Sequence, residues 1–211
     1  MSIRETTQPV SLNFHFDPLC PLAWRTALWI REVRNIRPVD VHWHFFSLEV
    51  VNRKPGVEPD YVNGNGWTAL RSLALARRKY GNEGVEKLYV ALGNAAHGRK
   101  ESLRDRAVVE ASAQQAGFGP DLVEAALADE STIQDVLADH QEAVERYLAF
   151  GVPTLAIEGS DVGFYGPVIN TVPHGEEAAE LWDYTAWLLR QPNIYELKRE
   201  RTRAQWGPVS A

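Results

Sequence analysis

Cys20, the single cysteine of this 211-residue chain, is the residue best suited to covalent chemistry. It follows the alternating segment Val10–Phe16, which predicts a β-strand, and precedes Pro21, a residue typical of the first position of a helix. A thiol at a helix N-terminus faces unpaired N–H groups and the positive end of the helix dipole, and both stabilise the nucleophilic thiolate. We therefore expect a reactive, partly exposed sulfur. The alternative is that Cys20 is a small buried side chain.

The residue three positions after Cys20 is Ala23. In a Cys-x-x-Cys redox pair this position holds a second cysteine, one helical turn from the first. The chain therefore has an attacking sulfur and lacks a resolving one. Any redox cycle would use a single protein thiol, and a second small thiol would have to resolve the mixed disulfide.

A second motif, Gly151-Val152-Pro153-Thr154, leads into an apolar run that predicts a short buried strand. Proline is tolerated at the head of a strand, where it removes no essential ladder hydrogen bond. Taken alone, the motif is also typical of an ordinary turn that enters a strand.

Together, Cys20-Pro21 at a helix start and the distant Gly151–Thr154 motif resemble the DsbA-like branch of the thioredoxin superfamily. In that family the proline is cis, and its loop lies beside the active cysteine. The residue before the proline offers backbone groups to a bound thiol or peptide. The resemblance therefore implies a cis Val152–Pro153 bond beside Cys20, with Val152 and Pro153 contacting the substrate.

More narrowly, the chain resembles the actinobacterial mycothiol-dependent nitroreductases over nearly its whole length. Those enzymes carry Cys-Pro-Trp-Cys, where this chain has Leu22 and Ala23 as its third and fourth residues. The resemblance implies mycothiol as a cosubstrate and places Pro21, Leu22 and Ala23 beside the bound thiol. The matching segments are Phe14–Pro21, Val41–Leu48, Phe164–Val168, Gly175–Ala178, Leu181–Asp183 and Tyr195–Arg199.

Three further residues are candidate substrate contacts. Asn52 and Tyr61 lie in residues 51–66, a predicted loop rich in proline and glycine, and long loops in compact domains are often functional. The matching loop of the nitroreductases borders the active cleft, which implies that both residues contact substrate. Their alternatives are a polar turn residue and a partly buried aromatic. His97 ends a helical pattern, where it either faces the cleft or stabilises the helix C-terminus.

The composition argues against several classes of partner and location. The net charge is −6 with no evident basic face, so nucleic acid is not an expected partner. No apolar run reaches the ~18–20 residues of a membrane span. Residues 1–7 lack the apolar core of a signal peptide, and a lone thiol stays reduced in the cytoplasm, so we expect a cytoplasmic protein.

No tightly bound cofactor or metal is expected. No Gly-rich phosphate loop follows a predicted strand, so the sequence contains no recognisable binding motif for a nucleotide or flavin. His42 and His44 share one face of a predicted strand, but no metal-binding signature supplies further ligands. Reduction by this protein would then draw its electrons from thiols.

The order of predicted elements is strand, helix, strand, a long helical block, two strands and a helix. We interpret it as an α/β, thioredoxin-like fold with an α-helical insertion of the DsbA type. Residues 1–50 and 150–211 would form the core, and residues 51–149 the loop and the insertion. The cleft between these units is expected to hold substrate, lined by Asn52 and Tyr61, because pockets favour domain interfaces. The predicted strands are Val10–Phe16, Val39–Phe46, Thr154–Glu158 and Val162–Tyr165, and the main predicted helices are Trp24–Asn35, Trp67–Tyr80, Gly84–Ala96, Ser102–Ala116, Pro120–Ala128, Ser131–Leu148 and Gly175–Leu189.

The favoured function is a cytoplasmic monothiol oxidoreductase that reduces a small electrophilic or nitro-type substrate through a mixed disulfide at Cys20. One alternative is a thiol-dependent transferase or isomerase of the kappa glutathione transferase type, in which Cys20 need not turn over. Another is an inactive, ligand-binding relative, since Leu22 and Ala23 depart from the active motif. The sequence does not determine the oligomeric state and is compatible with a homodimer.

Overall fold

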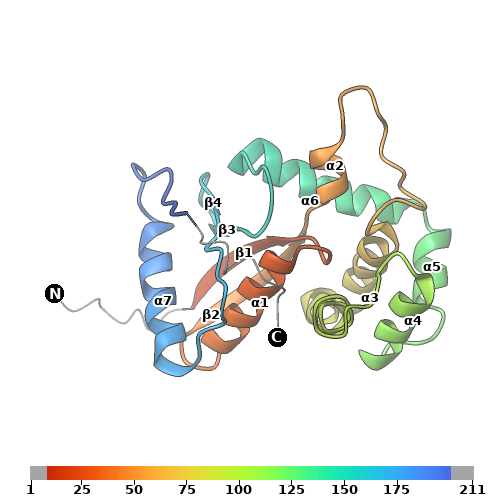
Figure 1. The fold of residues 1–211 in the computed structure, drawn as a ribbon, viewed down its shortest axis with the longest axis horizontal. Helices are drawn as coiled ribbons and strands as arrows, with labels where there is room; N and C mark the ends of the chain where they lie inside the picture. The colour runs from red at the N-terminus through yellow and green to blue at the C-terminus, as the bar shows by residue number, and fades with distance from the viewer. Residues whose placement is uncertain (1–8, 201–211) are drawn as a thin grey trace.

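The computed structural model describes residues 9–200, which form a four-stranded sheet flanked by helices (Figure 1). The strand order is β2-β1-β3-β4. The first pair is parallel, and the other two pairs are antiparallel. All four predicted strands are present, the last three with shorter ends. They are β1 (Val10–Phe16), β2 (Val39–Phe45), β3 (Thr154–Ile157) and β4 (Phe164–Tyr165).

Alternation along β1 divides the sheet into two faces. Leu12, Phe14 and Phe16 are fully buried on one face, whereas Asn13 and His15 point to the other. Helix α1 (Pro21–Val33) links β1 to β2 and packs against α7 (Gly175–Leu188). The indole nitrogen of Trp29 on α1 donates to the carbonyl of Ala178 on α7 at 2.9 Å, which ties the two helices together.

Residues 67–148 contain helices and their connections but no strand, as predicted. Figure 1 shows α3, α4 and α5 gathered on one side of the sheet and α7 on the other. The elements are α2 (Leu48–Asn52), α3 (Trp67–Gly93), the π-helical η1 (Asn94–Gly98), α4 (Arg106–Gln115), α5 (Leu122–Ala128) and α6 (Ser131–Tyr147).

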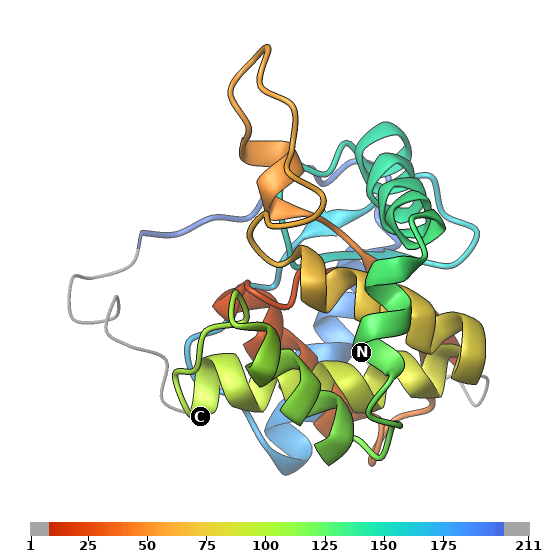
Figure 2. The ribbon, with the colours of Figure 1, turned by 90° about the vertical axis from the view of Figure 1, so that its right-hand side faces the viewer.

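Several local predictions differ from the structure; for example, the helix predicted from Ser102 begins at Arg106. The predicted loop 51–66 begins inside α2, so Val51 and Asn52 are helical, and the loop after α2 extends away from the rest of the chain (Figure 2). The predicted helices 67–80 and 84–96 are joined in α3 across a kink at Gly81, whose φ of 66° favours glycine.

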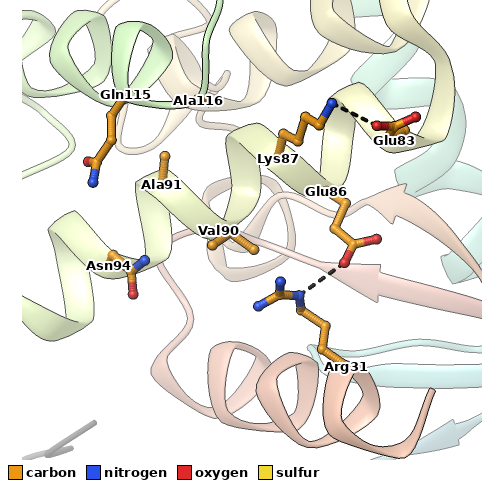
Figure 3. Close-up of a pocket in the computed structure, with 9 residues that line it drawn as sticks. All are labelled: Arg31, Glu83, Glu86, Lys87, Val90, Ala91, Asn94, Gln115 and Ala116. Atoms are coloured by element: carbon orange, nitrogen blue, oxygen red, sulfur yellow. Dashed lines mark hydrogen bonds and ion pairs between the residues drawn. The ribbon is translucent and has the colours of Figure 1, made fainter. Parts of the chain in front are cut away.

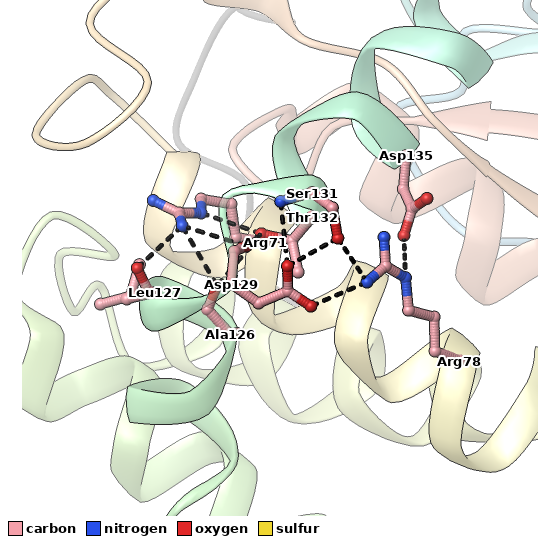
Figure 4. A network of polar contacts seen from close by, with 8 residues as sticks. All are labelled: Arg71, Arg78, Ala126, Leu127, Asp129, Ser131, Thr132 and Asp135. Carbon is pink, nitrogen blue, oxygen red and sulfur yellow. Dashed lines mark hydrogen bonds and ion pairs between the residues drawn. The ribbon is translucent and has the colours of Figure 1, made fainter.

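A buried arginine links three helices of this helical block (Figure 4). The Arg71 guanidinium donates to the carbonyls of Ala126, Leu127 and Asp129 and to Thr132 Oγ1, at 2.9 to 3.4 Å. These carbonyls lie at the end of α5, where a helix leaves acceptors unpaired. A cation at this negative end of the helix dipole is stabilised, so Arg71 joins α3 to the junction of α5 and α6.

The division into segments 1–50, 51–149 and 150–211 stays a prediction, and residues 1–8 and 201–211 of the outer segments lie outside the described residues. Residues 1–7, on which the expectation of no signal peptide rests, are among them. Between residues 9 and 200, no helix has the length and apolar character needed to cross a membrane.

Candidate active site

Cys20 is the N-cap residue of α1. Its backbone N–H donates to the carbonyl of Asp17 at 2.9 Å, which closes the turn that leads from β1 into the helix. Its sulfur accepts a hydrogen bond from the N–H of Ala23 at 3.4 Å. The thiol therefore lies at the helix start, where the order of strand and helix in the sequence predicts it.

The second motif supplies a carbonyl to the same sulfur. The Cys20 thiol donates to the backbone oxygen of Val152 at 3.3 Å, and the Val152–Pro153 peptide bond is cis. The carbonyl of Pro153 accepts from the N–H of Gly166 at 2.8 Å, so this loop is tied to the segment after β4. Two segments far apart in the sequence thus enclose the thiol.

The expectation of a partly exposed, activated thiol is wrong for this structure. Cys20 is only 6% exposed. Burial raises the pKa of its thiol, and the charge of Asp17 adds to the increase, while the N–H groups of Ala23 and Leu22 lower it. The helix N-terminus acts in the predicted direction, but loss of hydration has the larger effect.

Asp17 anchors the cysteine turn from inside the protein. Its side chain is fully buried, and its two carboxylate oxygens accept from the N–H groups of Leu19 and Leu48, each at 2.8 Å. Burial raises its pKa to about 6. Asp17 thereby joins the turn before Cys20 to the first residue of α2. Its position in the turn was the only sequence signal for this role.

His97 contacts the cysteine turn directly. Its ring is buried on Trp24, and its Nε2 lies 2.9 Å from the carbonyl oxygen of Pro18. A carbonyl only accepts, so Nε2 carries the hydrogen. Burial lowers the pKa of His97, which favours the neutral ring. His97 therefore holds the turn before Cys20, a role that neither sequence interpretation included.

The other predicted contact residues differ in their surroundings. Asn52 is exposed and donates to Leu48 O within its own helix at 2.8 Å, whereas Tyr61 packs edge-on against Trp67 with ring centroids 4.8 Å apart. Tyr61 matches its alternative of a partly buried aromatic, whereas Asn52 is the last residue of α2 and not a turn residue. In the cysteine motif itself, Pro21 is exposed, Leu22 is half-buried and Ala23 is buried.

A cavity of about 520 Å³ opens between α1 and the helices α3 and α4 (Figure 3). It lies between the two predicted units, but Asn52, Tyr61 and Cys20 do not line it, so the expected lining is wrong for this cavity. Ion pairs occupy part of its wall, including Arg31 with Glu86 at 3.0 Å. The lining residues are Arg31, Glu83, Glu86, Lys87, Val90, Ala91, Asn94, Gln115 and Ala116.

Histidines gather on the opposite face of the sheet from Phe14. The rings of His15 and His44 stack at 4.9 Å, and His140 on α6 accepts from the N–H of Ser47 at 3.3 Å. Over residues 9–200, no group of three or more His, Cys, Asp or Glu side chains is arranged to hold a metal ion. His42 lies instead 3.5 Å from Asp40.

Residues 19–199, which include Cys20 and the Val152–Pro153 loop, match the family described as Rv2466c-like, mycothiol-dependent nitroreductase Rv2466c. The chain belongs to this family. The resemblance to the mycothiol-dependent nitroreductases, inferred from segments along nearly the whole sequence, is thus confirmed.

Individual relatives agree with this family and its fold. The uncharacterized protein Rv2286c of Mycobacterium tuberculosis (strain ATCC 25618 / H37Rv) is 36% identical over 196 residues, covering 92% of this chain and 84% of that protein. The probable DsbA oxidoreductase SCO1869 from Streptomyces coelicolor superposes with a TM-score of 0.61 at 19% identity, covering 89% of this chain and 94% of its own. The cytosolic disulfide reductase DsbM from Pseudomonas aeruginosa, solved with GSH, superposes with a TM-score of 0.59 at 15% identity, covering 84% and 100%. The predicted DsbA-like thioredoxin fold is thus confirmed.

Proposed function

We propose that this member of the nitroreductase family is a monothiol oxidoreductase. It uses mycothiol to reduce a small electrophilic or nitro-type compound through a mixed disulfide at Cys20. The observation that carries the proposal is the position of the sulfur, between the first N–H groups of α1 and the carbonyl of Val152. Ala23, at the position of a resolving cysteine, makes the cycle depend on a second small thiol.

The cycle balances with two small thiols for each two-electron reduction. In the first half, Cys20 and one mycothiol each lose a proton and an electron to the acceptor, and their sulfurs form a mixed disulfide. In the second half, the thiolate of another mycothiol attacks the sulfur of the bound mycothiol. The Cys20 thiolate leaves and takes a proton, so mycothiol disulfide is released.

The chain's own groups have distinct parts in this cycle. The N–H group of Ala23 stabilises the leaving Cys20 thiolate, as charge-assisted hydrogen bonds do. Val152 and Pro153 border the bound thiol from one side, and Pro21 and Leu22 border it from the helix side. A cytoplasmic location belongs to this proposal, because the cycle needs Cys20 to return to the thiol state.

Intact mass analysis tests the mixed disulfide. After exposure to mycothiol disulfide, the wild-type chain should gain the mass of one mycothiol, and Cys20→Ser should gain none. With a nitroaromatic acceptor and mycothiol as the sole reductant, Cys20→Ser should lose turnover. The proposal would be contradicted if the wild-type protein gained no mass from mycothiol disulfide and did not reduce the nitroaromatic acceptor.

A second candidate is a transferase or isomerase that activates the bound thiol without turnover of Cys20. The burial of Cys20 and its raised thiol pKa favour this candidate, because both slow attack by the protein sulfur. It predicts that Cys20→Ser retains most of its activity with a thiol cosubstrate. The same variant therefore separates the two functions.

A further inference from the structure

Two aromatic side chains lie exposed beside the loop that contacts Cys20. Phe150 is 70% exposed, and Tyr165 on β4 is 41% exposed. Their ring centroids are 4.9 Å apart, with 31° between the ring planes. Single exposed apolar residues are ordinary on protein surfaces, whereas exposed apolar side chains that adjoin one another are typical of sites that bind a ligand or a partner. This pair therefore calls for a functional explanation.

The backbone places the pair close to the thiol. Phe150 is two residues before Val152, whose carbonyl oxygen lies 3.3 Å from the Cys20 sulfur. Two residues of extended chain span at most about 7 Å. Tyr165 pairs with Thr154 across the β3–β4 ladder, and Thr154 directly follows the cis-proline loop. Both rings are thus attached to segments that adjoin the loop over the sulfur.

The carbonyl groups of this loop are already hydrogen-bonded inside the protein. Gly151 O accepts from Thr154 Oγ1 at 2.7 Å, and Pro153 O accepts from the N–H of Gly166 at 2.8 Å. The third carbonyl, that of Val152, accepts from the thiol. A ligand that approaches the sulfur therefore finds the acceptors of the loop in use, whereas the aromatic surface beside them is exposed.

We propose that Phe150, with Tyr165 beside it, is a specificity-determining residue that gives the site a preference for electrophiles with an aromatic ring. Aromatic rings attract one another in offset-stacked and edge-to-face arrangements, beyond the effect of the area that they bury. A nitro group withdraws electrons from its ring, which favours stacking on the electron-rich faces of phenylalanine and tyrosine. The role rests on the proposed function, in which Cys20 meets a small electrophile.

The surrounding strands favour a small planar ligand over an extended peptide. A peptide that binds by strand addition needs an open sheet edge. The strand that follows the loop, β3, is paired on both sides, with β1 and with β4. The edge strand β4 is only two residues long, so it offers little backbone to a peptide. A single ring needs no such edge and can lie against the exposed face of Phe150.

The test compares alkylation of Cys20 by N-phenyl iodoacetamide and by iodoacetamide, which share a reactive carbon and differ by a ring. The ratio of their rate constants measures the preference for the ring, because the reactivity of the thiolate cancels. In Phe150→Ala this ratio should fall by about two- to tenfold, as expected for the loss of one aromatic contact. Phe150→Leu retains apolar area without the ring and should lower the ratio as well.

Tyr184→Ala is the matched control, because Tyr184 is an aromatic residue of α7 that is 53% exposed. This variant should keep the wild-type ratio. An unchanged ratio in Phe150→Ala, or an equal fall in Tyr184→Ala, overturns the proposal. A wild-type ratio that varies with protein concentration would show that the rings pair with a second copy of the chain, and this result also overturns it.

A binding measurement covers the case in which the buried thiol reacts with neither reagent. Titration of 4-nitrobenzyl alcohol into ¹⁵N-labelled protein should shift the amide signal of Gly151 in the wild type and leave it unshifted in Phe150→Ala. The absence of a shift in the wild type overturns the proposal. Neither measurement needs turnover, so a chain with this preference that forms no mixed disulfide with mycothiol would contradict the reductase function alone.

Discussion

The thiol of Cys20 and the carbonyl oxygen of Val152 lie 3.3 Å apart, although the two residues are separated by 132 positions in the sequence. This hydrogen bond joins the start of α1 to the loop before β3. It also holds the thiol in its protonated form inside the protein. In the proposed cycle, the Cys20 sulfur would exchange this contact for one with a substrate or a small thiol.

The charge of Asp17 should restrain the reactivity of Cys20. Asp17→Asn removes that negative charge, so the thiol pKa should fall and alkylation at a fixed pH should accelerate by up to about tenfold. Rates of iodoacetamide modification across pH measure the effect. Asp60→Asn is the matched control, because Asp60 also accepts two backbone hydrogen bonds but is exposed. Equal profiles for wild type and Asp17→Asn would contradict the assigned electrostatic effect.

A cysteine at position 23 should convert the monothiol site into a dithiol site. In Ala23→Cys the two sulfurs would lie on one helix face, so mild oxidation should form an internal disulfide, detected as the loss of two free thiols. Because Ala23 is fully buried, the larger side chain should cost about 1–3 kcal/mol of stability. Leu22→Cys is the control, because residues two positions apart in a helix do not face each other. Retention of two free thiols in oxidised Ala23→Cys would refute this geometry.

His97 should stabilise the cysteine turn through its bond to Pro18. His97→Phe keeps an aromatic ring beside Trp24 but leaves the carbonyl without this donor, which should cost about 1–3 kcal/mol of unfolding free energy. Urea denaturation measures the loss. His97→Gln retains an N–H donor and should recover part of it. If both variants are as stable as wild type, the contact has no energetic role.

Acid should destabilise the protein through its buried histidines. Burial lowers the pKa of His15 to about 3 and that of His140 to about 4, from 6.5 in each case. The unfolded chain therefore binds more protons below about pH 6.5, so each histidine contributes stability at neutral pH that is lost as the pH falls toward its folded pKa. The raised pKa of Asp17, from 3.8 to about 6, acts in the opposite direction between those values. For His15 and His140 against Asp17, the net loss between pH 6 and pH 4 should be about 1.4 kcal/mol per pH unit. The pKa values of His44 and His97 are lowered as well, so these two histidines should add to the loss.

Urea denaturation at several pH values tests this dependence. His140→Gln should flatten it, because one of the two histidine contributions is removed while an acceptor for the N–H of Ser47 is retained. His174→Gln, at an exposed histidine, is the control and should follow the wild type. Stability that is constant, or that rises on acidification, would contradict the assigned shifts.

The strands and the helix start that carry the two motifs could be predicted from the sequence. Alternation over residues 10–16, Pro21 after the cysteine and the apolar run after Pro153 each depend on neighbouring residues, and the corresponding strand, helix start and strand are present. The two motifs indicated the DsbA-like branch, and further segments such as Val41–Leu48 and Phe164–Val168 indicated the nitroreductase family. The missing resolving thiol is a property of the sequence alone.

The chemical state of the site depended on tertiary packing. Whether Cys20 is activated is a balance between helix N–H groups, which are local, and burial, which is imposed by segments far away in the sequence. Likewise, the contact of His97 with Pro18 and the packing of Tyr89 against Trp24 require η1 and α3 to lie against α1 and the turn before it. A sequence pattern records which groups are neighbours along the chain, whereas hydration and long-range hydrogen bonds depend on what the fold places around them. That is why the sequence determined where the thiol lies, and only the tertiary structure decided that it is buried and protonated.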